Sequence, residues 1–387
     1  MNVRARFGVW QFDINVPQVM HMTAFRPGNR ANVPLRQATR QEPPGSQLPI
    51  DVRAVKVRDL FSLSTIGERY PLDLPNGECF EIDPVRIATK QLMPMLRHDR
   101  PLLVARSDRG IVAYATFAVI GPDQRWVLQG VGSRTGIYEP EPIWEELFRY
   151  AVISAGLDGT KRLFARMPVG TSVLAAARKV GFAPYVSESI WAASLVPVTR
   201  PGRYARRQQQ ADVWSIHQLY MSAVPRQVQY AEAVTSHSWD LNAQQLPNGA
   251  SCRGWLVEDG HMVCAYARVI SYPRAHTIEF LVDPDHREVL GDLLSTVFAE
   301  LGRLSARRIY VTLRGYQGES AAMLEQFGLV PHLEQDVHIK YTTAPVKAPM
   351  VTVSPFATDV KEPSAKRVPT FLHGSHSDPT SETLGSS

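Results

Sequence analysis

An internal duplication spans most of this 387-residue chain and constrains its fold more than any other feature. Two blocks, near 51–196 and 205–343, repeat the same order of predicted elements. Apolar residues with helical spacing recur in both at a constant offset of 146 residues, which is typical of a repeated structural unit. The matched positions are Ile143, Trp144, Leu147, Phe148, Ala151, Val152 and Ala155 in block one, and Val289, Leu290, Leu293, Leu294, Val297, Phe298 and Leu301 in block two. We therefore predict two tandem copies of one domain.

Each block starts with a predicted β-hairpin and ends with a short helix and a strand. The hairpin strands meet at a polar turn that ends in Gly110 or Gly260. A third strand, the long helix and a fourth strand follow. The short helix then ends at Gly181 or Gly328, where glycine suits a left-handed helix cap. This alternation predicts an α/β fold in which helices flank a twisted mixed β-sheet.

Composition sets the remaining boundaries. The first 55 residues hold seven Arg against three acidic residues, so they carry +4 of the formal net charge of +5. We interpret residues 1–50 as a solvated, irregular basic arm. A break rich in Pro and Arg makes 197–204 a linker between the domains 51–196 and 205–343. The stretch 344–387 is rich in Pro, Ser and Thr without apolar periodicity, which predicts a disordered tail.

The sequence excludes several classes of protein. No stretch approaches the roughly 18 consecutive apolar residues of a membrane span. The first residues lack the apolar core of a secretory signal, so we expect a cytoplasmic protein. Cys79, Cys252 and Cys264 are too few and too widely spaced for a disulfide framework or a zinc site. The histidines show no metal-binding spacing either, so we expect no metal.

The order of elements resembles the GCN5-related N-acetyltransferase (GNAT) superfamily, and the duplication is similar to its tandem two-domain members. The resemblance covers both blocks and implies acyl transfer, with acetyl-CoA as the expected co-substrate, to an amine of a small molecule or peptide. The family's acyl-CoA-binding segment corresponds to 282–294 in block two. By this resemblance the cofactor-binding residues are Val282, Arg287, Glu288, Val289, Leu290 and Gly291. Backbone N–H groups at such a helix N-terminus bind a pyrophosphate.

The two blocks match this pattern unequally. In block two, Asp292 stands where the family has a small residue, and its carboxylate would repel a phosphate unless it points away. Block one has a segment about five residues longer before its helix, rich in Pro and Glu, in which Gly132 and Gly136 are the remaining candidates for phosphate contact. We therefore expect block one to be a degenerate copy and block two to hold the site.

Two residues are candidates for the proton transfers that amine acylation needs. The family often places a Glu on the strand before the cofactor loop, and Glu279 holds that place in block two. A Glu on an otherwise apolar strand is costly to bury without a purpose, so it is either the general base or faces solvent. The family's usual acid, a Tyr in the short helix, is replaced by Leu324 here, and Tyr316 is the candidate substitute.

Other interpretations stay open. Trp214, Tyr220, Tyr230 and Trp239 fall where the first two helices of block two are expected, and we interpret them as core residues, with substrate contact as the alternative. The departures of both cofactor loops from the family pattern also suit a protein that binds CoA as a sensor and does not catalyse a reaction. The Arg-rich arm and linker suit a nucleic-acid-associated protein, although we expect no nucleic-acid partner. The sequence leaves the acceptor and the oligomeric state open.

Overall fold

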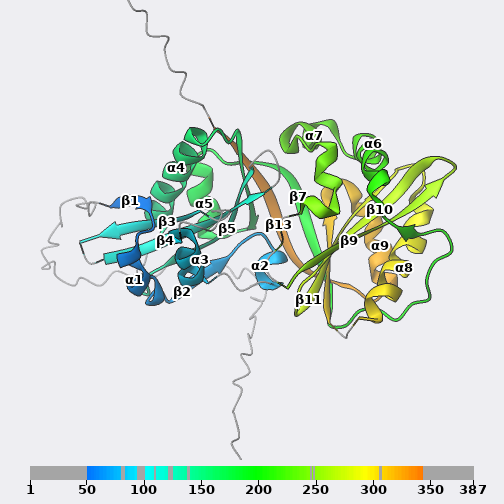
Figure 1. The fold of residues 1–387 in the computed structure, drawn as a ribbon, viewed down its shortest axis with the longest axis horizontal. Helices are drawn as coiled ribbons and strands as arrows, with labels where there is room; N and C mark the ends of the chain where they lie inside the picture. Colours follow the sequence, from blue (N-terminus) through cyan, green and yellow to red (C-terminus); the bar gives the residue numbers. More distant parts are fainter. Residues whose placement is uncertain are drawn as a thin grey trace, which may run out of the picture. The chain divides into compact units, whose positions relative to one another are not determined.

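The residues described by the computed structural model form a thirteen-stranded mixed β-sheet with helices on both faces (Figure 1). The description covers residues 50–342 except 80–82, 94–100, 109, 121–124, 137–139, 245, 247–248 and 305–306. The predicted basic arm, apart from Ile50, and the predicted tail lie outside these residues. All described residues belong to one compact unit. The predicted α/β class is confirmed.

The first half holds the predicted order of elements after a short leading segment. The leading elements are β1 (Asp51–Ala54), η1 (Val57–Asp59), α1 (Leu60–Ser64), β2 (Glu68–Pro71), α2 (Asn76–Cys79) and α3 (Pro84–Leu92). The repeated unit is β3 (Leu102–Ser107), β4 (Gly110–Ile120), β5 (Arg125–Ser133), α4 (Glu141–Leu157), β6 (Arg162–Pro168), α5 (Ser172–Lys179) and β7 (Ala183–Ala193). The predicted hairpin is the antiparallel pair β3–β4.

The second half repeats this order. It begins with β8 (Arg206–Arg207), η2 (Gln210–Asp212), α6 (Val213–Ala223), α7 (Arg226–Glu232), η3 (Ser236–Trp239) and η4 (Leu241–Ala243). The repeated unit is β9 (Ser251–Asp259), β10 (Met262–Ser271), β11 (Ala275–Val282), η5 (Arg287–Val289), α8 (Leu290–Gly302), β12 (Arg308–Arg314), η6 (Gly315–Ser320), α9 (Ala321–Gln326) and β13 (Val330–Tyr341). Gly181 and Gly328 have φ of +90° and +77°, the left-handed cap that glycine adopts without strain.

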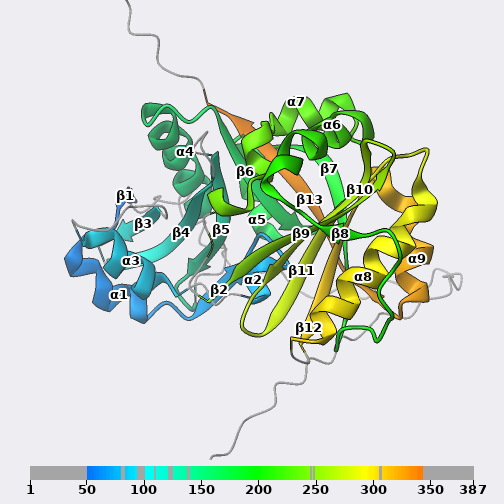
Figure 2. The ribbon, with the colours of Figure 1, turned by 45° about the vertical axis from the view of Figure 1, so that its right-hand side comes forward.

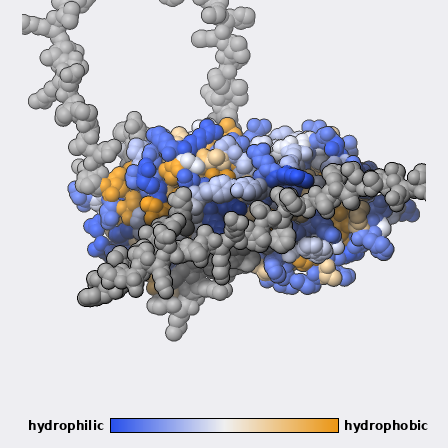
Figure 3. Space-filling model, turned by 90° about the horizontal axis from the view of Figure 1, so that it is seen from above, coloured by the Kyte–Doolittle hydropathy of each residue, from blue (hydrophilic) through white to orange (hydrophobic). Residues whose placement is uncertain are grey.

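Strand alternation explains why helices cover both faces of the sheet. In β3, Leu103 and Ala105 pack beneath α4 and α5, whereas Leu102 and Val104 point to the other face, beneath α1 and α3. In the second half, α8 and α9 cover one face and α6 and α7 the other. The predicted apolar stripes of α4 and α8 are the sides that face the sheet. The face shown in Figure 3 is mostly hydrophilic, with smaller groups of hydrophobic residues.

The last strand of each half lies in the other half's part of the sheet, which the sequence did not predict. The strand order is β1-β3-β4-β5-β6-β13-β7-β12-β11-β10-β9-β8. Strand β13 therefore runs antiparallel beside β6 of the first half, and β7 beside β12 of the second. The two exchanged strands also pair with each other, between β6 and β12 (Figure 2). Each half thus depends on the other to complete its sheet.

This exchange predicts that neither half folds alone. Fragments 49–204 and 205–342, expressed separately, should be insoluble or lack cooperative unfolding, because each loses the strand that covers an exposed sheet edge. Co-expression of the two fragments should restore a soluble complex with the circular dichroism of the intact chain. As a control, the chain cleaved at a protease site inserted in the linker should stay associated. A fragment that folds cooperatively by itself would contradict the prediction.

Candidate active site

The parallel strands β11 and β12 separate midway along their length. They pair from Ala275 with Arg308 to Glu279 with Thr312, and the pairing ends there. Beyond this point the side chain of Gln317 bridges them, because its Nε2 donates to the carbonyl of Phe280 at 2.8 Å and its Oε1 accepts from the N–H of Arg314 at 3.0 Å. The gap therefore lies directly after Glu279, beside the predicted cofactor segment.

The equivalent gap in the first half is filled by the chain itself. Strands β5 and β6 pair in parallel only over 126–128 with 163–165. Beyond that, β2 pairs antiparallel with β5. The N–H groups of Leu72 and Asp73 then donate to the carbonyls of Gln129 and Arg166, at 2.7 and 3.3 Å. The segment 68–73 thus occupies the space between the two strands.

Gly132 serves this packing. A side chain there would meet the Tyr114 ring at 2.3 Å and the Glu68 carbonyl at 2.9 Å. The approach of β2 therefore requires a residue without Cβ at this position. The sequence interpretation of Gly132 as a candidate for phosphate contact missed this packing role.

The predicted cofactor residues of the second half lie together at the end of the gap. Val282 ends β11, Arg287, Glu288 and Val289 form η5, and Leu290 and Gly291 begin α8. The side chain of Leu290 is buried in the core, so only its backbone is available there. The exposed side chain of Arg287 pairs with Glu319 of η6. The arrangement is a strand, a loop and a helix N-terminus, and η5 precedes α8 so that the N–H groups of Val289 and Leu290 donate to the carbonyls of His286 and Arg287.

Asp292 points away from this loop, as phosphate binding requires. Its carboxylate accepts hydrogen bonds from the N–H groups of Arg203, Tyr204 and Ala205, at 2.6, 2.9 and 3.1 Å. Nearby, Gly202 N–H donates to Thr296 Oγ1 at 2.9 Å. The predicted linker is therefore held along α8, and the charge of Asp292 is used there.

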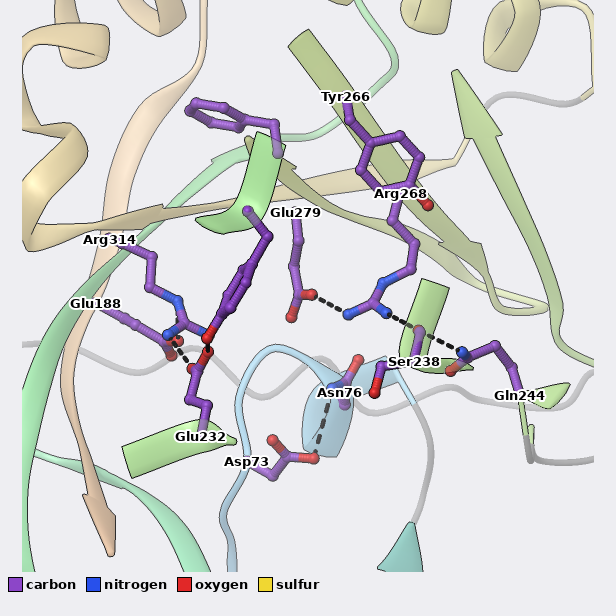
Figure 4. A network of polar contacts seen from close by, with 12 residues as sticks. Asp73, Asn76, Glu188, Glu232, Ser238, Gln244, Tyr266, Arg268, Glu279 and Arg314 are labelled. Atoms are coloured by element: carbon purple, nitrogen blue, oxygen red, sulfur yellow. Dashed lines mark hydrogen bonds and ion pairs between the residues drawn. The ribbon is translucent and has the colours of Figure 1, made fainter. Parts of the chain in front are cut away.

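A cavity of about 360 Å³ adjoins the gap and takes its lining from both halves of the sheet. Both predicted catalytic residues, Glu279 and Tyr316, line it. The exchanged strands contribute Tyr185 and Val337. Figure 4 shows several of its polar side chains converging from β10, β11, β12 and the helices of the second half.

Glu279 forms an ion pair in this cavity. Its Oε2 lies 2.6 Å from Arg268 Nη2, and its Oε1 lies 3.9 Å from Arg166 Nη2. Burial alone would raise the pKa of Glu279, but Arg268, Arg166 and Arg314 together outweigh it and lower the pKa to about 2. The side chain keeps 40% of its surface accessible. Glu279 is thus a permanent anion that a ligand in the cavity can reach, and a weak proton acceptor while Arg268 stays in place.

Tyr316 follows directly after β12, at the start of η6. Burial, partly offset by Arg314, raises the pKa of its hydroxyl to about 12. Tyr316 is therefore protonated at neutral pH, and its hydroxyl can donate a proton. The structure places both candidates in one cavity, and their catalytic roles stay a prediction.

A buried ion network beside the cavity joins the two halves. The side chain of Glu188, on the exchanged strand β7, is fully buried and lies 3.0 Å from Arg166 Nε and 3.1 Å from Arg314 Nε. Arg166 also pairs with Asp73 at 2.7 Å, and Arg314 with Glu232 at 2.5 Å. The sequence did not single out these residues, although each arginine ends or interrupts an apolar strand, as Glu279 does.

The four aromatic residues of the sequence analysis divide into two pairs. Tyr220 and Trp239 are buried and line the cavity. Trp214 and Tyr230 are 61% and 73% exposed, so the interpretation as core residues was wrong for them. The α6 and α7 faces that carry them point away from the sheet.

The remaining sequence expectations concern metals and membranes. Among the described residues, no three His, Cys, Asp or Glu side chains are grouped to hold a metal ion. No helix in the described part of the chain is both long enough and apolar enough to cross a membrane.

Loss of the Glu188 carboxylate should destabilise the fold strongly. In Glu188→Gln the half-buried guanidinium groups of Arg166 and Arg314 lose a shared, fully buried counter-charge, so we expect the free energy of unfolding to fall by about 3 kcal/mol in denaturant titrations. Glu145→Gln removes the exposed pair with Arg149 and should cost less than about 1 kcal/mol. Equal effects of the two variants would show that the buried network does not hold the halves together.

Known proteins similar to this chain are found among solved structures. No protein-family model and no curated protein matches the sequence. The structure is similar to a GCN5-related N-acetyltransferase from Sphaerobacter thermophilus, with a TM-score of 0.48 and 13% identity over 76% of this chain and 97% of that one. It is also similar to a tandem GNAT protein from the clavulanic acid biosynthesis pathway (TM-score 0.45, 14% identity, 76% and 99% covered) and to a putative acetyltransferase from Pyrococcus horikoshii (0.45, 12%, 80% and 94%).

Proposed function

We propose that this chain is an acyl-CoA-dependent N-acyltransferase with one donor site, in the second half. The observation that carries the proposal is the contrast between the halves. The gap between β11 and β12 opens onto a cavity that contains Glu279, whereas β2 fills the gap between β5 and β6. This contrast also supports the expectation that the first half is a degenerate copy.

The donor would bind along the second gap. The N-terminus of η5 would offer the backbone N–H groups of Arg287 and Glu288 to the pyrophosphate of acetyl-CoA. The N–H groups of Val289 and Leu290 donate to the carbonyls of His286 and Arg287. Asp292 is turned away and held by the linker, so it does not oppose the phosphates. Gln317 has to release the carbonyl of Phe280 if a donor amide is to pair with that strand.

In the reaction, the amine nitrogen attacks the thioester carbonyl, a C–N bond forms and the C–S bond breaks. The amine loses a proton and the departing thiolate gains one. We assign to Glu279 the binding of the amine. When Arg268 moves away from Glu279, the Glu279 carboxylate accepts the proton that the amine loses. We assign Tyr316 to protonation of the thiolate, because its hydroxyl keeps its proton at neutral pH.

The Glu279→Gln variant tests this assignment. We expect turnover of acetyl-CoA with an amine panel to fall by at least about a hundredfold, the usual worth of a positioned acid–base group, while acetyl-CoA affinity stays within twofold. Because Glu279 has a pKa of about 2, it does not change charge between pH 5 and 9, so the rate should fall equally across that range. Glu334→Gln, at an exposed position on β13, should change neither quantity. A variant that keeps a third of the turnover would remove Glu279 from the mechanism.

A catalytically silent CoA-binding protein is the second candidate. Two observations favour it: Gln317 bridges the donor gap, and Arg268 neutralises Glu279. Saturating acetyl-CoA at 100 times its dissociation constant should then add about 2.7 kcal/mol to the free energy of unfolding without turnover of any amine. The third candidate, a nucleic-acid-associated protein, depends on the basic arm of residues 1–50, which lies outside the described residues except for Ile50. The salt dependence of any DNA or RNA binding tests that alternative.

A further inference from the structure

The charged groups in and beside the cavity do not all have partners. The guanidinium groups belong to Arg125, Arg166, Arg268 and Arg314, and the carboxylates to Asp73, Glu188, Glu232 and Glu279. Three of the arginines form ion pairs with these carboxylates. Among the residues that the structure describes, no carboxylate pairs with Arg125. Together these groups carry equal numbers of positive and negative charges, and Arg125 is the cation that has no carboxylate partner among the described residues.

Arg125 is poorly satisfied where it stands. It begins β5 and lines the cavity. Its Nη1 donates to the Glu232 carbonyl and its Nη2 to Ser238 Oγ, both at 3.4 Å, longer than the 2.7–2.9 Å of charge-assisted hydrogen bonds. Its Nε is buried and has no hydrogen-bond partner among the described residues. A buried donor without an acceptor is costly, and an anionic group of a ligand would satisfy it.

Arg125 belongs to the same part of the cavity as Glu279. Ser238 connects them, because its hydroxyl accepts from Arg125 and its carbonyl accepts from Arg268 Nη1 at 3.4 Å. Arg268 in turn holds Glu279 (Figure 4). In the order of these contacts the four residues form a row, with the guanidinium of Arg125 at one end, Ser238 and Arg268 between, and the accessible carboxylate of Glu279 at the other end.

Glu279 is the carboxylate of this site that a ligand can reach. Its side chain is 40% exposed, compared with 0% for Glu188, 7% for Asp73 and 12% for Glu232. An amine without an anionic group would place an uncompensated positive charge in this neutral, partly buried site. A zwitterion would leave the site neutral and match both ends of the row.

We infer that the acceptor is a small amino-carboxylate, such as a free amino acid, with its ammonium at Glu279 and its carboxylate at Arg125. This rests on the proposed function, because it names the acceptor of the same site. The volume of about 360 Å³ lies at the low end of small-molecule sites and suits a ligand of this size. Trp239, Tyr266 and Tyr272 add apolar surface for its side chain. Arg125 then determines specificity for the carboxylate.

The test measures binding, so that it does not depend on acyl transfer. The full-length chain is titrated in a calorimeter with the twenty standard amino acids and with their α-carboxamides, both with and without CoA. Each carboxamide keeps the amine and the side chain but lacks the negative charge. We expect at least one amino acid to bind, and to bind at least tenfold more tightly than its carboxamide.

Variants assign the difference to Arg125. In Arg125→Gln the amino acid should bind as weakly as its carboxamide, whose affinity should not change, and Arg125→Lys should recover part of the difference. Arg86→Gln, on the exposed side of α3, should leave both affinities unchanged. Equal binding of acid and amide, equal weakening of both by Arg125→Gln, or no binding by any amino acid would overturn the inference. Binding without turnover would instead overturn the proposed acyltransferase function and leave this inference standing.

Discussion

The structure depends on one buried carboxylate, Glu188, which lies between the guanidinium groups of Arg166 and Arg314. These arginines belong to β6 and β12, the strands that occupy the same place in the two halves, and Glu188 reaches both from an exchanged strand. Removing one member of a buried ion network leaves its partners charged and unsolvated. The continuous sheet through β6, β13, β7 and β12 joins the halves, and Glu188 links the charged side chains of β6 and β12 across it.

The two halves show that the same arrangement of strands can leave a gap filled or unfilled by another strand. In both, a parallel pair of strands separates midway. In the first half, β2 completes the hydrogen bonds of the separated strands, and Gly132 allows it to approach. In the second half, a single side chain, Gln317, makes that connection. A strand is held by many backbone bonds, whereas a side chain can rotate away, so only the second gap is readily opened.

The cavity combines strong charges with overall neutrality. Its carboxylates and guanidinium groups lie close enough to set each other's ionisation, and the pKa of Glu279 falls to about 2 as a result. Glu279 is therefore better described as a fixed anion than as a proton acceptor poised near neutral pH. A site of this kind selects ligands by matching charge. Arg125, which has no carboxylate partner among the described residues, comes from the half whose gap is filled by β2.

The sequence by itself determined the α/β class, the order of elements in both halves, the two hairpins and the glycine-capped short helices, because these follow from local apolar periodicity and backbone preference. The resemblance to the GNAT superfamily also singled out Glu279 and Tyr316 as candidates, and the charge of Glu279 on an otherwise apolar strand is visible locally. Only the tertiary structure decided the exchange of β7 and β13, the filling of the first gap by β2 and the ion network around Glu188. Many of these contacts join residues far apart in the sequence, such as Glu68 of β2 with Ser133 of β5 and Glu188 with Arg314. Strand periodicity specifies which side of a sheet a residue faces, and it carries no information about which strand lies beside it.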